Sequence, residues 1–169
     1  ARLVKMDHSV VAVDIGNSYI KAAALMDVQS PLDLQGTPVA TFKPEDIGNA
    51  QWLDLLGSLP VETHWFLASV NQSSLDCVVQ WLDSQTIPPQ KTILNHQHIS
   101  LDFSAVDVEQ VGVDRLLSAL GAMIASENSF PLVVVDIGTA VTIDAVTADG
   151  AFLGGVIMPG IYLSSLALA

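Results

Sequence analysis

Apolar residues recur along the chain with two different periods, which separate the predicted strands from the predicted helices. At 9–15 and 132–136, β-branched and apolar residues follow one another almost without a break, as is typical of strands buried in a sheet. Residues 111–127 instead repeat at helical spacing and predict an amphipathic helix. The apolar stripe of that helix consists of Leu116, Leu117, Leu120, Met123 and Ile124. In chain order, the predicted strands are 9–15, 19–26, 38–42, 64–70, 91–94, 132–136, 141–147 and 152–158, and the predicted helices are 44–59, one capped within 71–74 that continues to 82, 111–127 and a last one after 160.

The chain contains one internal repeat. The sequence VAVDIG at 11–16 returns as VVVDIG at 133–138, with five of six positions identical. Turn residues and a second strand follow each copy, and the first turn is predicted at Gly16-Asn17. Solenoid repeats have periods of about 20 to 50 residues, whereas Asp14 and Asp136 are 122 residues apart. The pattern therefore predicts two similar strand–turn–strand units.

Composition narrows the class of protein. Half of the 169 residues are hydrophobic, yet every apolar run is shorter than the roughly 18 residues that a membrane-spanning helix needs. Six basic and eighteen acidic residues give a net charge of −12, which repels a nucleic-acid backbone. The first residues lack the apolar core of a secretory signal, and the single cysteine cannot form an internal disulfide. These features predict a cytoplasmic protein that binds neither membranes nor nucleic acids.

Each copy of the repeat ends on a carboxylate followed by a glycine turn. A glycine directly after a strand lets successive backbone N–H groups approach phosphate oxygens. Asp14 and Asp136 would repel a phosphate unless a cation lay between them, so they are candidate holders of Mg²⁺ or its waters. Further donors at the two turns are Asn17, Ser18, Thr139 and Thr142. One copy is explained as well by an ordinary Asp-Gly turn, but the pair favours a phosphate cradle that is neither a Walker loop nor a dinucleotide fingerprint.

A third candidate segment, Gly112-Val113-Asp114-Arg115, opens the predicted helix at 111–127. Gly112 permits close approach of a ligand, and a helix N-terminus attracts anions. The Arg115 guanidinium can bind a carboxylate through two hydrogen bonds. In phosphoryl transfer the base mainly orients a hydroxyl, and Asp114 suits that role. Both charges are equally consistent with ordinary residues of a first helical turn.

Four motifs, taken in chain order, resemble those of the type III pantothenate kinases. They are DIGNSYIK at 14–21, GVDR at 112–115, DIGTAVTID at 136–144 and GGVIMPG at 154–160. The resemblance implies an α/β fold with two ribonuclease H-like halves and mixed sheets, as in the actin-like ATPase superfamily. It places the first half at 1–129 and an incomplete second half at 130–169. It also implies ATP-dependent phosphorylation of pantothenate to 4′-phosphopantothenate, the first step toward coenzyme A.

The same resemblance implies roles for individual residues. Asp114 corresponds to the general base and Arg115 to the partner of the pantothenate carboxylate, with Gly112 beside them. Asp14 would hold Mg²⁺ through water, and Asp136 a monovalent cation, K⁺ or NH₄⁺. The residues implied to bind the ATP phosphates are Asp14, Gly16, Asn17, Ser18, Lys21, Gly138 and Thr139. The implied protein is a homodimer whose substrates are pantothenate and ATP.

The segment before Gly112 departs from the family pattern and keeps other functions open. Where the family carries a Tyr and an Asn-Pro pair, this chain reads FSAVDVEQVG, with Ala105, Asp107 and Val108 at the matching places. The alternative is therefore a regulatory relative that binds nucleotide without phosphorylating pantothenate. A third hypothesis is a superfamily kinase or phosphatase acting on a sugar or polyphosphate, and the short GVDR insert disfavours a sugar kinase.

Other conspicuous residues are interpreted as structural. His96 and His98 are expected at an exposed strand end, since nothing else with ligand spacing accompanies them. Cys77 is expected to be a buried small hydrophobe. Asp144 and Asp149 are expected to be strand-edge and turn charges. Residues expected in the core or in an interface are Trp52, Trp65 and Trp81.

Overall fold

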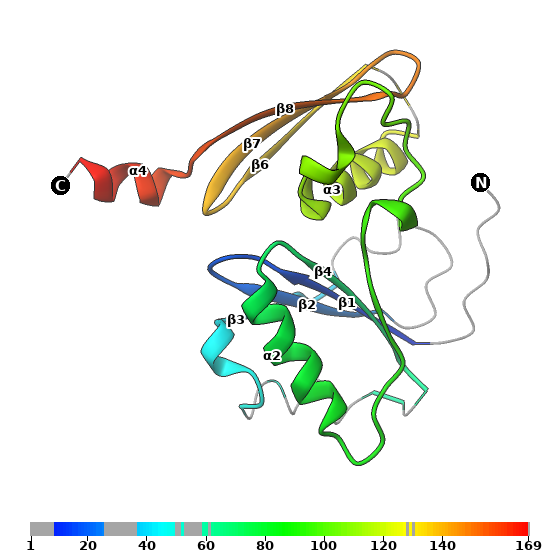
Figure 1. Ribbon diagram of the computed structural model, residues 1–169, viewed down its shortest axis with the longest axis vertical. Coiled ribbons are helices and arrows are strands. Elements are labelled where there is room, and N and C mark those ends of the chain that lie inside the picture. The colour runs from blue at the N-terminus through cyan, green and yellow to red at the C-terminus, as the bar shows by residue number, and fades with distance from the viewer. Residues whose placement is uncertain are drawn as a thin grey trace. The chain divides into compact units, whose positions relative to one another are not determined.

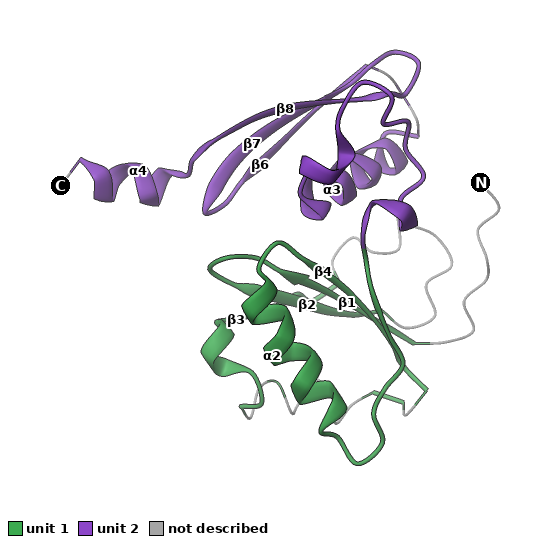
Figure 2. Ribbon diagram, viewed as in Figure 1, with its two compact units in different colours: residues 1–94 green, residues 95–169 purple. Residues whose placement is uncertain are grey.

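The computed structural model describes residues 9–25, 37–49, 52, 59–60, 62–127, 129 and 131–168 (Figure 1). The chain forms two compact units, residues 1–94 and 95–169 (Figure 2). The GVDR segment belongs to the second of these units, because the helix that it opens packs on the sheet that follows it. The division into halves at 129 stays a prediction.

The first unit is built on a mixed five-stranded sheet with the order β3-β2-β1-β4-β5. Its strands are β1 (Val10–Ile15), β2 (Ile20–Leu25), β3 (Ala40–Phe42), β4 (His64–Ser69) and β5 (Lys91–Ile93). β1 pairs antiparallel with β2 and parallel with β4, so the carboxyl ends of β1 and β4 lie at the same edge of the sheet. The predicted first hairpin is confirmed, since the N–H of Gly16 donates to the carbonyl oxygen of Tyr19 at 3.0 Å.

A helix, α2 (Gln72–Asp83), follows β4 and packs against it. The side chain of Asn71 caps this helix by accepting a hydrogen bond from the backbone N–H of Ser74 at 3.0 Å, which confirms the predicted cap. The residues of β1 that join the same core are Val11, Val13 and Ile15. Because side chains alternate along a strand, Asp14 projects from the opposite face of β1 and is exposed.

Aromatic side chains fill the core of the first unit. The ring centroid of Trp52 lies 4.8 Å from that of Phe42, 5.4 Å from Trp81 and 6.2 Å from Trp65. This arrangement confirms the prediction that the tryptophans pack in a core. Half of the predicted helix at 44–59 lies outside the described residues, and its described start is a 3₁₀ turn, η2 (Pro44–Asp46).

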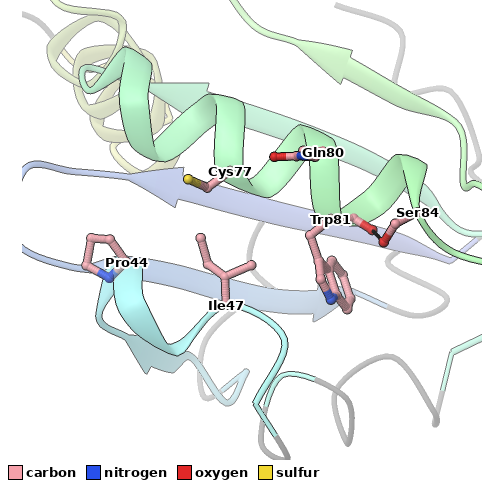
Figure 3. A pocket seen from close by; sticks show the side chains of 6 residues that line it. All are labelled: Pro44, Ile47, Cys77, Gln80, Trp81 and Ser84. Atoms are coloured by element: carbon pink, nitrogen blue, oxygen red, sulfur yellow. Dashed lines mark hydrogen bonds between the residues drawn. The ribbon is translucent and has the colours of Figure 1, made fainter.

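A cavity of about 400 Å³ lies between η2 and α2 (Figure 3). Its lining residues are Pro44, Ile47, Cys77, Gln80, Trp81 and Ser84. Cys77 is exposed, so the prediction of a buried thiol was wrong. The buried stripe of α2 runs through Leu75, Val78 and Leu82, and Cys77 lies about 100° around the helix from Val78, outside that stripe.

The second unit contains an antiparallel sheet with the order β6-β7-β8. Its elements are η3 (His96–His98), η4 (Val108–Gln110), α3 (Val113–Ala125), β6 (Leu132–Ile137), β7 (Ala140–Val146), β8 (Phe152–Pro159) and α4 (Ile161–Ala167). These confirm the predicted helix at 111–127 and the three predicted strands. Across the described part of the chain, every helix is too short or too polar to span a bilayer.

The face of α3 that meets β6 and β7 is rotated from the predicted apolar stripe. Its buried residues are Val113, Leu116 and Ala119. Ile124, which the stripe included, is 43% exposed. Ala119 is fully buried, but the predicted stripe did not include it because it was drawn from the larger apolar side chains.

Candidate functional site

The first candidate phosphate turn is the tight hairpin between β1 and β2. Asp14 lies directly opposite Lys21 in the antiparallel register. Nζ of Lys21 is 3.9 Å from Oδ2 of Asp14, and the two side chains are 56% and 50% exposed. An ion pair this exposed contributes little to stability. Because both side chains are half exposed, both charged groups are accessible to a ligand. A Cβ at Gly16 would lie only 3.2 Å from the carbonyl oxygen of Tyr19, which favours glycine at the turn.

A second loop flanks the first turn, and sequence reasoning did not assign it to the site. β4 runs parallel to β1, so its last residue, Ser69, and Asn71 shortly after it lie at the same edge of the sheet. The backbone N–H of Asn71 donates to Oγ of Ser69 at 3.0 Å, and Nδ2 of Asn71 donates to Oδ1 of Asn17 at 3.4 Å. Ligands of open α/β sheets bind beyond the carboxyl ends of the strands. The polar residues directly after a predicted strand were the available signal, but only strand order shows that they lie beside Asn17.

The second candidate phosphate turn repeats the hairpin between β6 and β7. The N–H of Gly138 donates to the carbonyl oxygen of Ala140 at 2.9 Å. Asp136 lies opposite Thr142 in the register of the two strands. Asp136, Gly138 and Thr139 are all exposed, as residues that contact a ligand must be before it binds.

Gly160, directly after β8, packs tightly on this second turn. Its N–H donates to the carbonyl oxygen of Thr139 at 2.9 Å. A Cβ at Gly160 would lie 2.2 Å from the carbonyl oxygen of Gly138 and 2.5 Å from that of Thr139. The last glycine of the GGVIMPG motif is therefore required by close backbone approach, and it holds the turn in place.

The start of α3 is joined to β7 by a buried ion pair. Nε of Arg115 donates to Oδ2 of Asp144 at 3.0 Å, and Nη2 donates to Oδ1. The two side chains are only 10% and 2% exposed. The prediction that Asp144 is a strand-edge charge was therefore wrong, because β7 is the central strand of its sheet and α3 covers the middle of it.

The Asp144 carboxylate shifts the pKa of Arg115. The hydrogen bond to Asp144 is the main cause that raises the pKa of the Arg115 guanidinium above its ordinary value, and the charges of Asp144 and Asp114 act in the same direction. A raised pKa on a base means that the pair stabilises the fold below the unfolded-state pKa and is lost only as pH rises past the folded-state value. The shift reinforces a positive charge that arginine carries at any ordinary pH.

Asp114 occupies the first turn of α3, after the N-cap residue Gly112. Its Oδ1 accepts a hydrogen bond from the backbone N–H of Arg115 at 2.8 Å. The register of β6 and β7 puts Asp136 on the same face of the sheet as Asp144, which is the face that α3 covers. The GVDR segment and the second turn therefore share one face of the second sheet.

The two candidate phosphate turns belong to different compact units, the first to residues 1–94 and the second to residues 95–169. The hypothesis that they grip a phosphate chain from two sides stays a prediction. Each turn offers one exposed or half-exposed carboxylate, Asp14 or Asp136. Mg²⁺ is usually held by one or two carboxylates together with phosphates and waters, so these sparse donors fit a cation that binds with a nucleotide.

His96 and His98 lie apart from both turns in sequence. His96 and His98 belong to the 3₁₀ turn η3, so the prediction of a strand end was wrong. Nδ1 of His98 is hydrogen-bonded to Oδ1 of Asn95 at 2.8 Å, which closes the turn. Over the described ranges, no three His, Cys, Asp or Glu side chains gather into a metal-binding group.

Comparison with solved structures shows the fold class. The crystal structure of a Sinorhizobium meliloti protein described as a 2-dehydro-3-deoxygalactonokinase is similar to 94% of this chain and 56% of that chain, with a TM-score of 0.51. The sequence identity is 14%, so the likeness concerns the fold alone. The chain has the α/β fold of the actin-like ATPases and sugar kinases, as the motifs predicted.

Comparison with known sequences shows the family. The family model described as type III pantothenate kinase matches residues 10–169. The type III pantothenate kinase of Rhodopirellula baltica is 32% identical over 178 residues, which cover 94% of this chain and 64% of that protein. Type III pantothenate kinase 2 of Francisella tularensis subsp. holarctica is 50% identical over 172 residues, which cover 94% of this chain and 63% of that protein. The chain belongs to the type III pantothenate kinase family, and it spans just under two thirds of the length of these relatives.

Proposed function

We propose that the protein transfers the γ-phosphoryl group of ATP to the hydroxyl of pantothenate, giving 4′-phosphopantothenate for coenzyme A synthesis. One observation carries the proposal: the same Asp-Ile-Gly hairpin is built in both units, and a helix that begins with GVDR covers the sheet of the second hairpin. Membership of the type III pantothenate kinase family supports the substrate. The acidic net charge of −12 is compatible with a small phosphorylated ligand held locally by backbone donors.

The two turns would bind the nucleotide. At the first, Asp14 holds Mg²⁺ through water, and the Lys21 ammonium lies beside it to contact a phosphate. At the second, Asp136 holds K⁺ or NH₄⁺ near the phosphates. The remaining phosphate-binding residues are Gly16, Asn17, Ser18, Gly138 and Thr139. The cations would neutralise the charge that develops on the transferred group.

The start of α3 would bind pantothenate. Asp114 accepts the proton of the attacking hydroxyl and orients it toward the phosphorus; because the transition state is loose, orientation matters more than basicity. Arg115 binds the pantothenate carboxylate, and Gly112 allows the substrate to approach the helix. The proposed protein is cytoplasmic, as the composition and cysteine usage predict, and a homodimer, as the family resemblance implies.

One observation favours a second candidate, a regulatory relative that binds nucleotide without turnover. Asp144 already holds two donors of the Arg115 guanidinium, and the Arg115 side chain is 10% exposed, as in a purely structural ion pair. The altered segment FSAVDVEQVG before the helix points the same way. In this case the protein would bind ATP and release no ADP when pantothenate is added.

The test is pantothenate-dependent ADP release with Mg²⁺, measured in K⁺ and in Na⁺ buffer. The protein is expressed together with any residues that flank this chain in its gene, and circular dichroism first shows that it is folded. Turnover that requires pantothenate and is faster in K⁺ supports the kinase. Binding of ATP by a folded protein that never releases ADP with pantothenate supports the regulatory candidate and overturns the kinase.

A further inference from the structure

The guanidinium of Arg115 is only partly used by Asp144. Arginine carries five N–H donors in one plane. Asp144 accepts from Nε and from Nη2, so the two donors of Nη1 and the second donor of Nη2 remain at the far edge. That edge has the fork geometry that binds a second carboxylate through two parallel hydrogen bonds. The ion pair therefore leaves Arg115 able to bind one more carboxylate in a fixed direction.

The direction of this edge is set by the sheet. Asp144 lies opposite Val134 of β6 and Gly155 of β8 in the strand registers. A Cβ at Gly155 would lie 1.7 Å from the carbonyl oxygen of Ile143 and 2.8 Å from Cα of Asp144, so β8 packs tightly on the backbone of β7 at Ile143 and Asp144. Because Asp144 is held in place and accepts two hydrogen bonds from the guanidinium, the long Arg115 side chain is fixed in one orientation.

The same pair also keeps Arg115 apart from Asp114. Neighbouring residues of a helix project about 100° from each other, and Arg115 reaches back to the sheet while Asp114 accepts from the backbone N–H of Arg115. Side chains at successive positions of a helix do not face each other, so the guanidinium that Asp144 holds and the Asp114 carboxylate remain separate groups. Asp144 thereby fixes where the Arg115 charge lies.

We propose that Asp144 is a positioning residue that acts through Arg115 to direct recognition of the substrate carboxylate. The inference rests on the function proposed above, in which Arg115 binds that carboxylate. Asp144 itself touches no substrate. Since Asp144 neutralises Arg115, the pair selects its partner by geometry more than by net charge. A substrate analogue without a carboxylate should therefore be insensitive to changes at Asp144.

The experiment compares pantothenate with pantothenol, in which a CH₂OH group replaces the carboxylate. Asp144→Asn keeps the shape of the side chain and removes its charge. We expect kcat/KM for pantothenate to fall on the order of 10- to 100-fold, mostly through KM, as for a misdirected substrate contact, while kcat/KM for pantothenol is unchanged. Asp144→Glu, which restores the carboxylate, should recover part of the loss. Asp149→Asn, an exposed turn residue of the same sheet, is the matched control and should behave as the wild type.

Each outcome supports or overturns the inference. An equal fall in kcat/KM for pantothenate and pantothenol in Asp144→Asn shows that the ion pair is only structural. That result overturns the positioning role of Asp144 and leaves the kinase assignment intact. A folded wild type with no pantothenate-dependent turnover overturns the proposed function, and this inference with it. Should Asp144→Asn fail to fold, Arg115→Met/Asp144→Leu replaces the pair by apolar groups, and that double variant must treat the two substrates alike; continued preference for pantothenate refutes the proposal.

Discussion

Gly160→Ala is the substitution for which the structure predicts the sharpest local effect. Gly160 has φ −66° and ψ 170°, a conformation that alanine adopts freely, so the cost of the added methyl group is steric alone. The new Cβ would lie 2.2 Å from the carbonyl oxygen of Gly138 and 2.5 Å from that of Thr139. Both neighbours are backbone atoms, so either the second candidate phosphate turn or the start of α4 must move.

The expected loss of stability in Gly160→Ala follows from this steric contact. Overpacking of a tight site costs about 1–3 kcal/mol. The matched control is Gly121→Ala on α3, where an added Cβ meets nothing within 4 Å. An exposed helical glycine replaced by alanine stabilises a protein by roughly 0.5–1 kcal/mol. Replacing glycine by alanine is thus expected to lower stability at Gly160 and to raise it at Gly121.

Thermal unfolding and nucleotide affinity test this prediction together. At about 2–4 °C per kcal/mol for a chain of this size, the melting temperatures of the two variants should differ by at least about 3 °C, with Gly160→Ala below the wild type. Calorimetric titration with a non-hydrolysable ATP analogue should show weaker binding only for Gly160→Ala, because its clash displaces the turn at 138–139. Equal stability and equal nucleotide affinity of the two variants would refute the packing of Gly160 on that turn.

Three further outcomes are expected. Asp114→Asn should lower pantothenate-dependent ADP release by at least about 100-fold with unchanged ATP affinity, and near-normal turnover would exclude Asp114 as the base. Asp144→Leu should cost about 3–5 kcal/mol in urea unfolding because it leaves the Arg115 charge buried and unpaired, whereas Arg115→Met/Asp144→Leu should be nearly neutral; equal losses would contradict a buried pair. Asn71→Ala should cost about 1 kcal/mol through the lost N-cap, and Ser73→Ala, an exposed residue of the same helix, should not.

Local patterns in the sequence were sufficient for most elements. The strands on both sides of the two Asp-Gly turns and the helix at 113–125 were predicted within a few residues, since hydrophobic period and turn chemistry act locally. The candidate site residues were recognisable for the same reason, because Asp, Gly and hydroxyl residues sit together in each hairpin. The end of β4 at Ser69 and the Asn71 that follows it were not assigned to the site, since their place beside Asn17 depends on the parallel pairing of β1 with β4.

The burial of Asp144 could not be predicted from the local sequence pattern. On β7 it alternates with Thr142 as a polar residue, which resembles an exposed strand face. Its partner Arg115 is 29 residues away in the chain, and the two meet because α3 packs on β7. Whether an acidic residue is a surface charge or half of a buried ion pair is decided by that packing.

The internal repeat shows most directly what the sequence alone determines and what only the tertiary structure decides. VAVDIG and VVVDIG determine the same local structure in both copies, a strand followed by a glycine turn with an aspartate at its end. Burial differs completely: Val11, Val13 and Ile15 are 0%, 3% and 0% exposed, whereas their counterparts Val133, Val135 and Ile137 are 68%, 53% and 65% exposed. Backbone geometry follows from interactions between near neighbours in the chain, which the two copies share. Burial follows from what packs on each face, and only the first copy has a core of tryptophans and a helix against that face within the described residues.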